Sequence, residues 1–167
     1  CCYAGPVDQA VKGVRPMREF GSPLVDLCVP KPCVQHQAMF DPSFPEGWWY
    51  YFRSCNVAAL TDPVIDVIAE HAPGMTSPLT AFPIFHLGGA ISRVGDDETA
   101  FNGRRTAHTV NVNAVTATSD GFDEEREWSR SFWTALRPFH DSVYVNFLME
   151  EGQDRVRAAY GAAKRGV

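Results

Sequence analysis

The sequence predicts an α+β domain in which an antiparallel β-sheet is covered on one side by helices. Residues 106–118 alternate between a mostly apolar face and an opposite face that carries Asn111 and Asn113. Residues 123–137 repeat Trp128, Phe132 and Leu136 at intervals of four, as an amphipathic helix does. Strands with one polar face are typical of antiparallel sheets whose other face packs on helices.

Length and composition are those of one globular domain over residues 1–167, with 45% hydrophobic and 21% charged residues. The net charge is −5 and no basic stripe is present, which argues against a nucleic-acid partner. No apolar run approaches the roughly 20 residues that span a bilayer, and no signal-peptide pattern is present. The first residue is Cys rather than Met, so we expect the chain to be part of a longer protein.

Cysteine and histidine spacing gives no metal-site prediction. The five cysteines are irregularly spaced and form no CxxC motif, which predicts free thiols in a reducing compartment and a cytoplasmic location. Nothing near them points to a catalytic cysteine. The five histidines show no metal-ligand spacing either, and a structural or exposed role is predicted for each, with His86 the one closest to a predicted site.

The first third of the chain is predicted to be mostly helix and loop. Residues 1–4 resemble the end of a strand, and Asp8 can cap a helix over 8–17 that stops at the Gly-Ser-Pro of 21–23. A short extended run at 24–29 lies before two prolines, and one or two helical turns are predicted over 33–40. Residues 41–47 have loop chemistry throughout.

The middle third is predicted to hold a strand, a helix and a second strand. Dense aromatic content predicts a strand over 48–55. Asp62 followed by Pro63 begins a helix with an apolar face, which the Pro-Gly of 73–74 ends. A strand over 79–88 then leads into Gly88-Gly89, a pair that either ends the strand or admits close approach to the backbone, and a polar turn follows at 95–98.

The last third repeats this alternation of strand and helix. The strand over 106–118 is followed by a turn at 119–121, then by the helix over 123–137, whose acidic first turn suits the helix dipole and which Pro138 ends. Residues 142–148 alternate as a short strand, and a final helix is predicted over 150–164.

Three sets of residues are predicted to line a site. Tyr144 and Asn146 share one face of the 142–148 strand, which is costly in a dry core and reasonable in a site; the alternative is a satisfied strand pair at a domain contact. Trp49 and Tyr51 share one face of the aromatic strand, opposite Trp48, Tyr50 and Phe52, and either set can line a pocket or fill the core. Asn111 and Asn113 face either solvent or a pocket. Arg93 and Arg104 are expected to form surface ion pairs.

Short motifs occur in a fixed order along the chain: GGA at 88–90, RV at 93–94, TAF at 99–101 with Arg104, YVN at 144–146 and AYG at 159–161. Upstream, the Pro32 to Gln37 spacing and Arg53-Ser54 after the aromatic strand agree with the same series. In order and spacing they resemble the C-terminal half of the berberine bridge enzyme-like FAD-linked oxidases.

This resemblance implies an antiparallel sheet backed by helices that forms the substrate domain of an FAD-linked oxidase, here without its N-terminal FAD-binding domain. Such enzymes pass a hydride from an alcohol, sugar or amine-type carbon to FAD, and oxygen reoxidises the flavin. By position, Tyr144 corresponds to the tyrosine near the substrate, often the base, and Asn146 to the residue close to the flavin. Trp49, Tyr51, Asn111 and Asn113 are the expected substrate contacts. The fragment alone is expected neither to hold FAD nor to turn over.

The sequence departs from the family pattern at several positions. Asn102-Gly103 precede Arg104 where the family often has His, and Cys33 stands where many members have Tyr. After Tyr160-Gly161 the family usually continues through a segment that returns to the FAD domain, which the residues up to Val167 do not match. The competing hypothesis is therefore a non-enzymatic α+β domain that binds a small ligand or another subunit. A degenerate gene product is a further alternative. We also expect the isolated chain to self-associate as a homo-oligomer through its uncovered sheet face.

Overall fold

The computed structural model describes residues 2–95, 98–99, 101, 103–147 and 149. The chain divides into two compact units, residues 1–45 and 46–167, although the sequence shows no linker between them. The prediction of a single domain over residues 1–167 stays a prediction.

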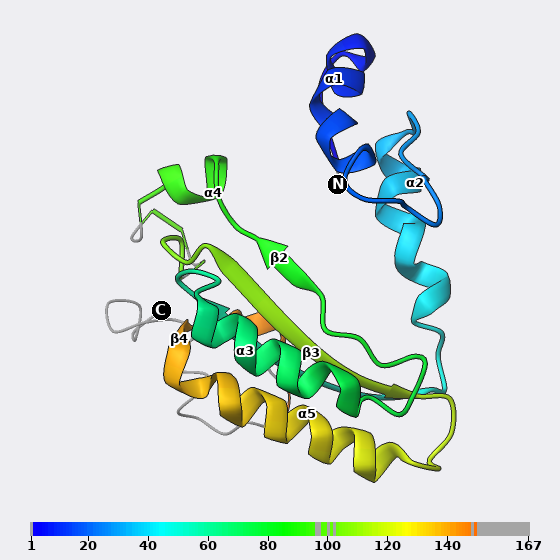
Figure 1. The fold of residues 1–167 in the computed structure, drawn as a ribbon, viewed down its shortest axis with the longest axis vertical. Helices are drawn as coiled ribbons and strands as arrows, with labels where there is room; N and C mark the ends of the chain where they lie inside the picture. The colour runs from blue at the N-terminus through cyan, green and yellow to red at the C-terminus, as the bar shows by residue number, and fades with distance from the viewer. Residues whose placement is uncertain (1, 96–97, 100, 102, 148, 150–167) are drawn as a thin grey trace. The chain divides into compact units, whose positions relative to one another are not determined.

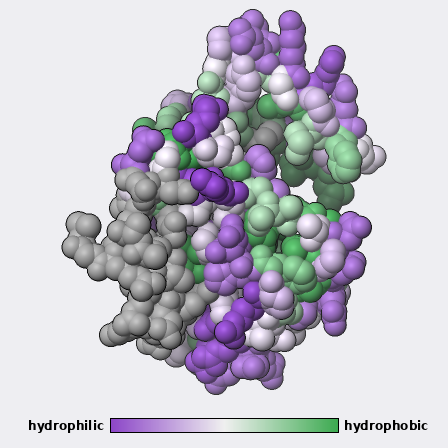
Figure 2. Space-filling view, turned by 90° about the vertical axis from the view of Figure 1, so that its left-hand side faces the viewer, coloured by the Kyte–Doolittle hydropathy of each residue, from purple (hydrophilic) through white to green (hydrophobic). Residues whose placement is uncertain are grey.

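The first unit is helical and thinly packed. It contains α1 (Val7–Arg18), α2 (Cys33–Gln37) and the 3₁₀ helix η1 (Ala38–Ser43). These agree with the helices predicted over 8–17 and 33–40, except that η1 extends into the loop predicted at 41–47. None of its described residues is buried, and Phe20, for example, is 85% exposed. Figure 2 shows one face of the molecule, on which apolar residues lie exposed among polar ones.

Local contacts correct two details of the first unit. Pro6 takes the position before α1, and Asp8 lies inside the first turn instead of capping it. The predicted extended run at 24–29 forms no strand. It is held instead by Arg18, whose Nε donates to Asp26 Oδ2 at 2.5 Å and whose second guanidinium nitrogen donates to the Cys28 carbonyl at 3.1 Å. The hydrogen bond from the Cys28 amide to Asp26 Oδ1, followed by the one from Arg18 Nε, lowers the pKa of Asp26.

The second unit is built on a four-stranded antiparallel sheet with the order β2-β3-β1-β4 (Figure 1). The strands are β1 (Trp49–Val57), β2 (Ile84–His86), β3 (His108–Thr116) and β4 (His140–Ser142). The two long strands pair over their whole length, from Trp49 opposite Thr116 to Val57 opposite His108. Both are rich in β-branched or aromatic residues, which favour the extended backbone.

Helices cover one face of this sheet, as predicted. Helix α5 (Phe122–Leu136) packs on β1 and β3, and α3 (Asp62–His71) packs on α5 (Figure 1). The short elements are α4 (Ala90–Arg93), η2 (Ala72–Gly74), η3 (Arg137–Phe139) and η4 (Val145–Phe147). The core between sheet and helices consists of Cys55, Val57, Val64, Val110, Val112, Phe132, Trp133 and Leu136.

Three predicted elements differ from the structure. The strand over 142–148 is wrong: β4 ends at Ser142, and the Phe147 amide donates to the Tyr144 carbonyl at 3.0 Å, which closes a 3₁₀ turn. The strand over 79–88 shrinks to Ile84–His86 with an isolated bridge between Ala81 and Asn113, because Pro83 has no amide to donate. No strand occurs at residues 2–4. The helix predicted over 150–164 lies outside the described residues.

Candidate functional site

The sheet face opposite α5 is polar and buried. The register places Ser54 opposite Asn111 and Asn56 opposite Thr109, so their side chains share this face. Asn111 is 4% exposed and Asn113 is 6% exposed. The predicted alternation of residues 106–118 is therefore confirmed, and the polar face of β3 is not a solvated one.

A chain of hydrogen bonds organises one end of this face. The Thr109 hydroxyl donates to Asn56 Oδ1 at 2.7 Å, and Asn56 Nδ2 donates to Ser142 Oγ at 2.9 Å. Ser142 Oγ lies 3.3 Å from the Thr106 hydroxyl, which continues the network from β3 through β1 to β4. Gly103 has a φ of +79° and packs against Ser142 and Asn56, where a side chain has no room. This network fixes the segments on both sides of the polar face.

The amides of Asn111 and Asn113 are different, because each has an unused acceptor. The Oδ1 atom of each is buried and has no hydrogen-bond partner among the described residues. A buried acceptor left without a donor costs about 1–3 kcal/mol. These two atoms lie two residues apart on one strand face, where a group with hydrogen-bond donors would satisfy both.

Tyr144 and Asn146 come together next to this face, although the strand that was expected to align them is absent. Asn146 Nδ2 donates to the Tyr144 hydroxyl oxygen at 2.7 Å. The Tyr144 ring lies 5.5 Å from Phe101 and 5.2 Å from Phe147, and Phe147 stacks on Phe85 at 6.0 Å. Because Phe85 pairs with Thr109 in the sheet, this aromatic cluster lies on the polar face.

Arg104 supports the aromatic cluster, and it does not lie on the surface as expected. Its side chain is buried, and its guanidinium donates to the Ile91 carbonyl at 3.1 Å and to the Thr99 hydroxyl. The same guanidinium lies over the Phe101 ring at 5.2 Å. Arg104 thus ties the segment after Gly88-Gly89 to the ring that contacts Tyr144.

The other two expected substrate contacts, Trp49 and Tyr51, lie on the opposite face of the sheet. Trp49 is 47% exposed and packs on Phe122 at 5.3 Å, while Tyr51 is buried beside Ala114 and Phe122. The structure therefore does not bring them together with Asn111 and Asn113. Their role in substrate binding stays a prediction.

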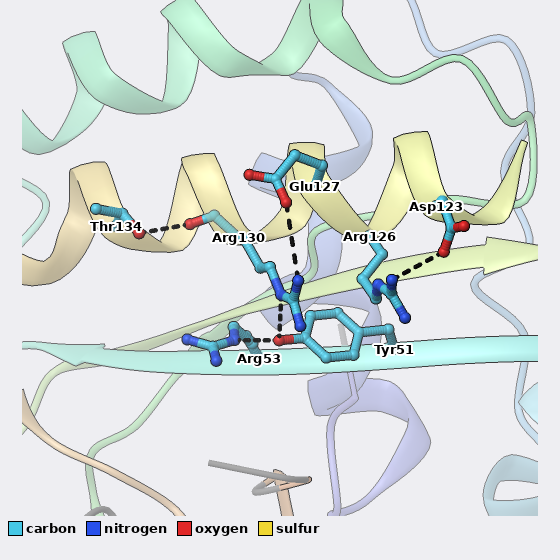
Figure 3. A network of polar contacts seen from close by, with 7 residues as sticks. All are labelled: Tyr51, Arg53, Asp123, Arg126, Glu127, Arg130 and Thr134. Carbon is cyan, nitrogen blue, oxygen red and sulfur yellow. Dashed lines mark hydrogen bonds and ion pairs between the residues drawn. The ribbon is translucent and has the colours of Figure 1, made fainter.

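Tyr51 belongs to an arginine network between β1 and α5 (Figure 3). Its hydroxyl oxygen accepts a hydrogen bond from Arg53 Nε at 2.6 Å and from Arg130 Nε at 3.3 Å. The hydrogen bond to Tyr51 raises the pKa of Arg130, and Glu127 lies 3.8 Å from the same guanidinium. These contacts anchor β1 to α5.

A buried carboxylate holds the loop that leads toward β2. Glu125 Oε1 accepts hydrogen bonds from the Thr76 amide at 2.6 Å, the Thr76 hydroxyl at 2.5 Å and the Ser77 amide at 2.6 Å. Burial raises the pKa of this carboxyl, but hydrogen bonds from Thr76, Thr80 and Ser77 outweigh it, and the net shift is downward. The acidic first turn predicted for α5 is present, and Glu125 is the residue of that turn that binds Thr76 and Ser77.

Sequence reasoning missed Ser54, Asn56 and Thr109 as residues of the polar face. The signal was available in part, since Ser54 and Asn56 alternate with Cys55 and Val57.

No group of three or more His, Cys, Asp or Glu residues in the described part of the chain is arranged to hold a metal ion. None of the helices formed by the described residues has both the length and the apolar character needed to cross a membrane.

Comparison with known proteins gives likenesses of structure only. No protein-family model and no curated protein matches the sequence. BBE-like 28 from Arabidopsis thaliana is similar over 88% of this chain and 35% of its own, with a TM-score of 0.64 and 17% identity. A variant of BBE-like 1 from Physcomitrella patens is similar over 68% of this chain and 25% of its own, with a TM-score of 0.60 and 20% identity.

This chain has the fold of part of the berberine bridge enzyme-like oxidases. A glycopeptide hexose oxidase, solved in complex with teicoplanin, is similar as well, over 68% of this chain and 25% of its own, with a TM-score of 0.56 and 18% identity. The resemblance stated from the sequence is confirmed as a likeness of fold. The chain spans about a quarter to a third of the length of these structures.

Proposed function

We propose that this chain is the substrate-binding part of an FAD-dependent oxidoreductase that takes a hydride from an alcohol, sugar or related substrate. The observation that carries the proposal is the pair of buried, unpartnered acceptors on Asn111 and Asn113, in a sheet with the fold of the BBE-like oxidases. A polyhydroxylated substrate supplies the donors that these acceptors lack.

The residues present fit the FAD that this fold implies. Asn146 is exposed, and its amide can both donate to and accept from a polar ring edge, so it is the residue expected to contact the flavin. Bound FAD would supply the acceptor for the hydride, with oxygen as the expected final acceptor. The FAD-binding domain is the partner that the proposal requires.

Tyr144 is proposed as the catalytic base. Its hydroxyl oxygen already accepts the Asn146 amide, and its ring is fixed between Phe101 and Phe147. In its phenolate form, Tyr144 would take the proton of the substrate hydroxyl. The carbon that bears this hydroxyl would give up its hydride to the acceptor that bound FAD supplies, so the alcohol becomes a carbonyl compound. Asn111 and Asn113 orient the remaining hydroxyl groups by accepting their hydrogen bonds.

The test is an absorption spectrum of the protein expressed from its full gene. Flavin bands that bleach when a candidate alcohol or sugar is added support the proposal. A colourless full-length protein refutes it and favours a non-enzymatic ligand-binding or subunit-association domain.

Two substitutions in the full-length protein then assign roles. Tyr144→Phe should lower kcat at least 100-fold with little change in KM, whereas the matched control Tyr3→Phe should change neither. Asn111→Leu should raise KM because it removes the acceptor. Unchanged turnover in Tyr144→Phe would remove this residue from the chemistry.

A further inference from the structure

Two histidines far apart in the sequence face each other across β2 and β3. His86 of β2 lies directly opposite His108 of β3 in the sheet register. The flanking backbone hydrogen bonds run from the Asn111 amide to the Pro83 carbonyl at 3.0 Å and from the Leu87 amide to the Ala107 carbonyl at 2.7 Å. This alternation makes His86 and His108 a non-hydrogen-bonded pair, in which opposing Cα atoms are only about 4.5 Å apart and side chains are closest.

The two imidazole rings already have a spacing suited to one shared metal ion. Their centroids are 5.2 Å apart and their planes are inclined by 63°. A first-row transition metal lies about 2.0–2.1 Å from an imidazole nitrogen, so two rings that ligate it at square or tetrahedral angles have centroids about 4.5–5.5 Å apart. The strand pair is fixed by its ladder, so the ligands are held in place before a metal arrives.

Among the described residues, neither imidazole has a hydrogen bond to another group. His86 is exposed, and Gly88 leaves room for its ring, since a Cβ there would lie 3.2 Å from His86 Cε1. His108 is half-buried, and its Nδ1 has no hydrogen-bond partner among the described residues.

We propose that His86 and His108 form a two-histidine site for one divalent transition metal ion of the Cu²⁺, Ni²⁺ or Zn²⁺ class, with water in the remaining positions. Cu²⁺ binds most tightly, as expected for nitrogen ligands. The spacing of 22 residues hides this site from sequence motifs, because only the strand register brings the two histidines together. The site lies on the helix side of the sheet and does not depend on the proposed oxidoreductase function.

The test is calorimetric titration of the untagged chain with CuCl₂ and, separately, NiCl₂. The thiols are first blocked with N-ethylmaleimide, because free cysteines also bind these metals. One ion should bind per chain. His86→Ala and His108→Ala should each weaken binding at least tenfold, whereas His36→Ala, a histidine of α2 outside the site, should leave the affinity unchanged.

Electron paramagnetic resonance of the Cu²⁺ complex provides a second readout. The spectrum should show two nitrogen ligands in the native chain and fewer in His86→Ala. If His108→Ala alters the circular dichroism spectrum, its weaker binding could come from a change in fold, and the test then rests on His86→Ala. His86 is exposed on an edge strand, so its replacement should leave the fold unchanged. Unchanged affinity in a natively folded His86→Ala variant, or a copper spectrum without two nitrogens in the native chain, overturns the proposal.

Discussion

Replacing Glu125 with Gln tests whether a buried carboxylate fixes the loop before β2. Glu125 is 1% exposed, and one of its oxygens accepts three hydrogen bonds from Thr76 and Ser77. Glu125→Gln keeps an acceptor of the same shape but removes its charge. It also puts an amide nitrogen at the position of Oε2, which is buried and has no hydrogen-bond partner among the described residues.

The expected loss follows from these bonds. A hydrogen bond to a charged group contributes about 1.5–3 kcal/mol and a neutral one about 0.5–1.5 kcal/mol, so three weakened bonds cost about 2–4 kcal/mol. Urea unfolding at pH 7, followed by circular dichroism, measures this loss in the free energy of unfolding. Glu124→Gln is the matched control, because Glu124 is exposed in the same helical turn and should change stability by less than about 0.5 kcal/mol.

The pH dependence gives an independent check. Because the pKa of Glu125 is lower in the folded chain than its ordinary value of 4.5, its stabilising effect is complete above about pH 4.5 and is lost as the pH falls through the folded pKa. The stability difference between the native chain and Glu125→Gln should therefore shrink below pH 4.5. A loss under about 1 kcal/mol at pH 7, or a difference that stays constant down to pH 3, would refute this reasoning.

Three other substitutions test the core, a turn and the aromatic cluster, all by urea unfolding. Phe132→Ala should lower the free energy of unfolding by about 3–5 kcal/mol because Phe132 is fully buried, whereas Phe20→Ala should be nearly neutral. Similar losses in the two variants would contradict the assignment of Phe132 to the core. Gly103→Ala should cost more than about 1 kcal/mol, since φ is +79° and the new Cβ has no room, and an unchanged stability would contradict this backbone conformation. Arg104→Lys should cost about 1–3 kcal/mol and alter the near-ultraviolet circular dichroism of the aromatic cluster, because an ammonium group cannot replace both guanidinium bonds; the same effect in the exposed neighbour Arg105→Lys would argue against a specific role.

Most of the second unit could be predicted because its signals are local. The alternation along β3 and the four-residue repeat of α5 each depend on a single element, and both elements formed where they were expected. The predictions for β2 and β4 were too long because pairing decided them. At Asn56 and Val57 the register with β4 shifts, and the ladder stops at Ser142. A strand pattern in the sequence carries no information about where its partner ends.

The candidate site was predictable in its residues more than in its geometry. Tyr144 and Asn146 are two residues apart, and the same spacing lets their side chains meet either on a strand face or within one 3₁₀ turn. The structure has the turn, and the amide of Asn146 bonds the phenol directly. Arg104 was misjudged because burial of an arginine depends on segments distant in sequence. Here the Ile91 carbonyl and the Phe101 ring supply its partners.

The two faces of β1 show why strand register decides which residues can share a site. Each strand's alternation separates its residues into two sets, but only the pairing of β1 with β3 shows which sets lie on one face. Phe52 lies opposite Asn113 and Ser54 opposite Asn111, so the even-numbered residues of β1 join the asparagines. Odd-numbered Tyr51 faces α5, where two arginines bind its hydroxyl. A substrate held by Asn111 and Asn113 would therefore contact the Phe52 side of β1, and substitutions there should alter KM more than substitutions at Tyr51 do.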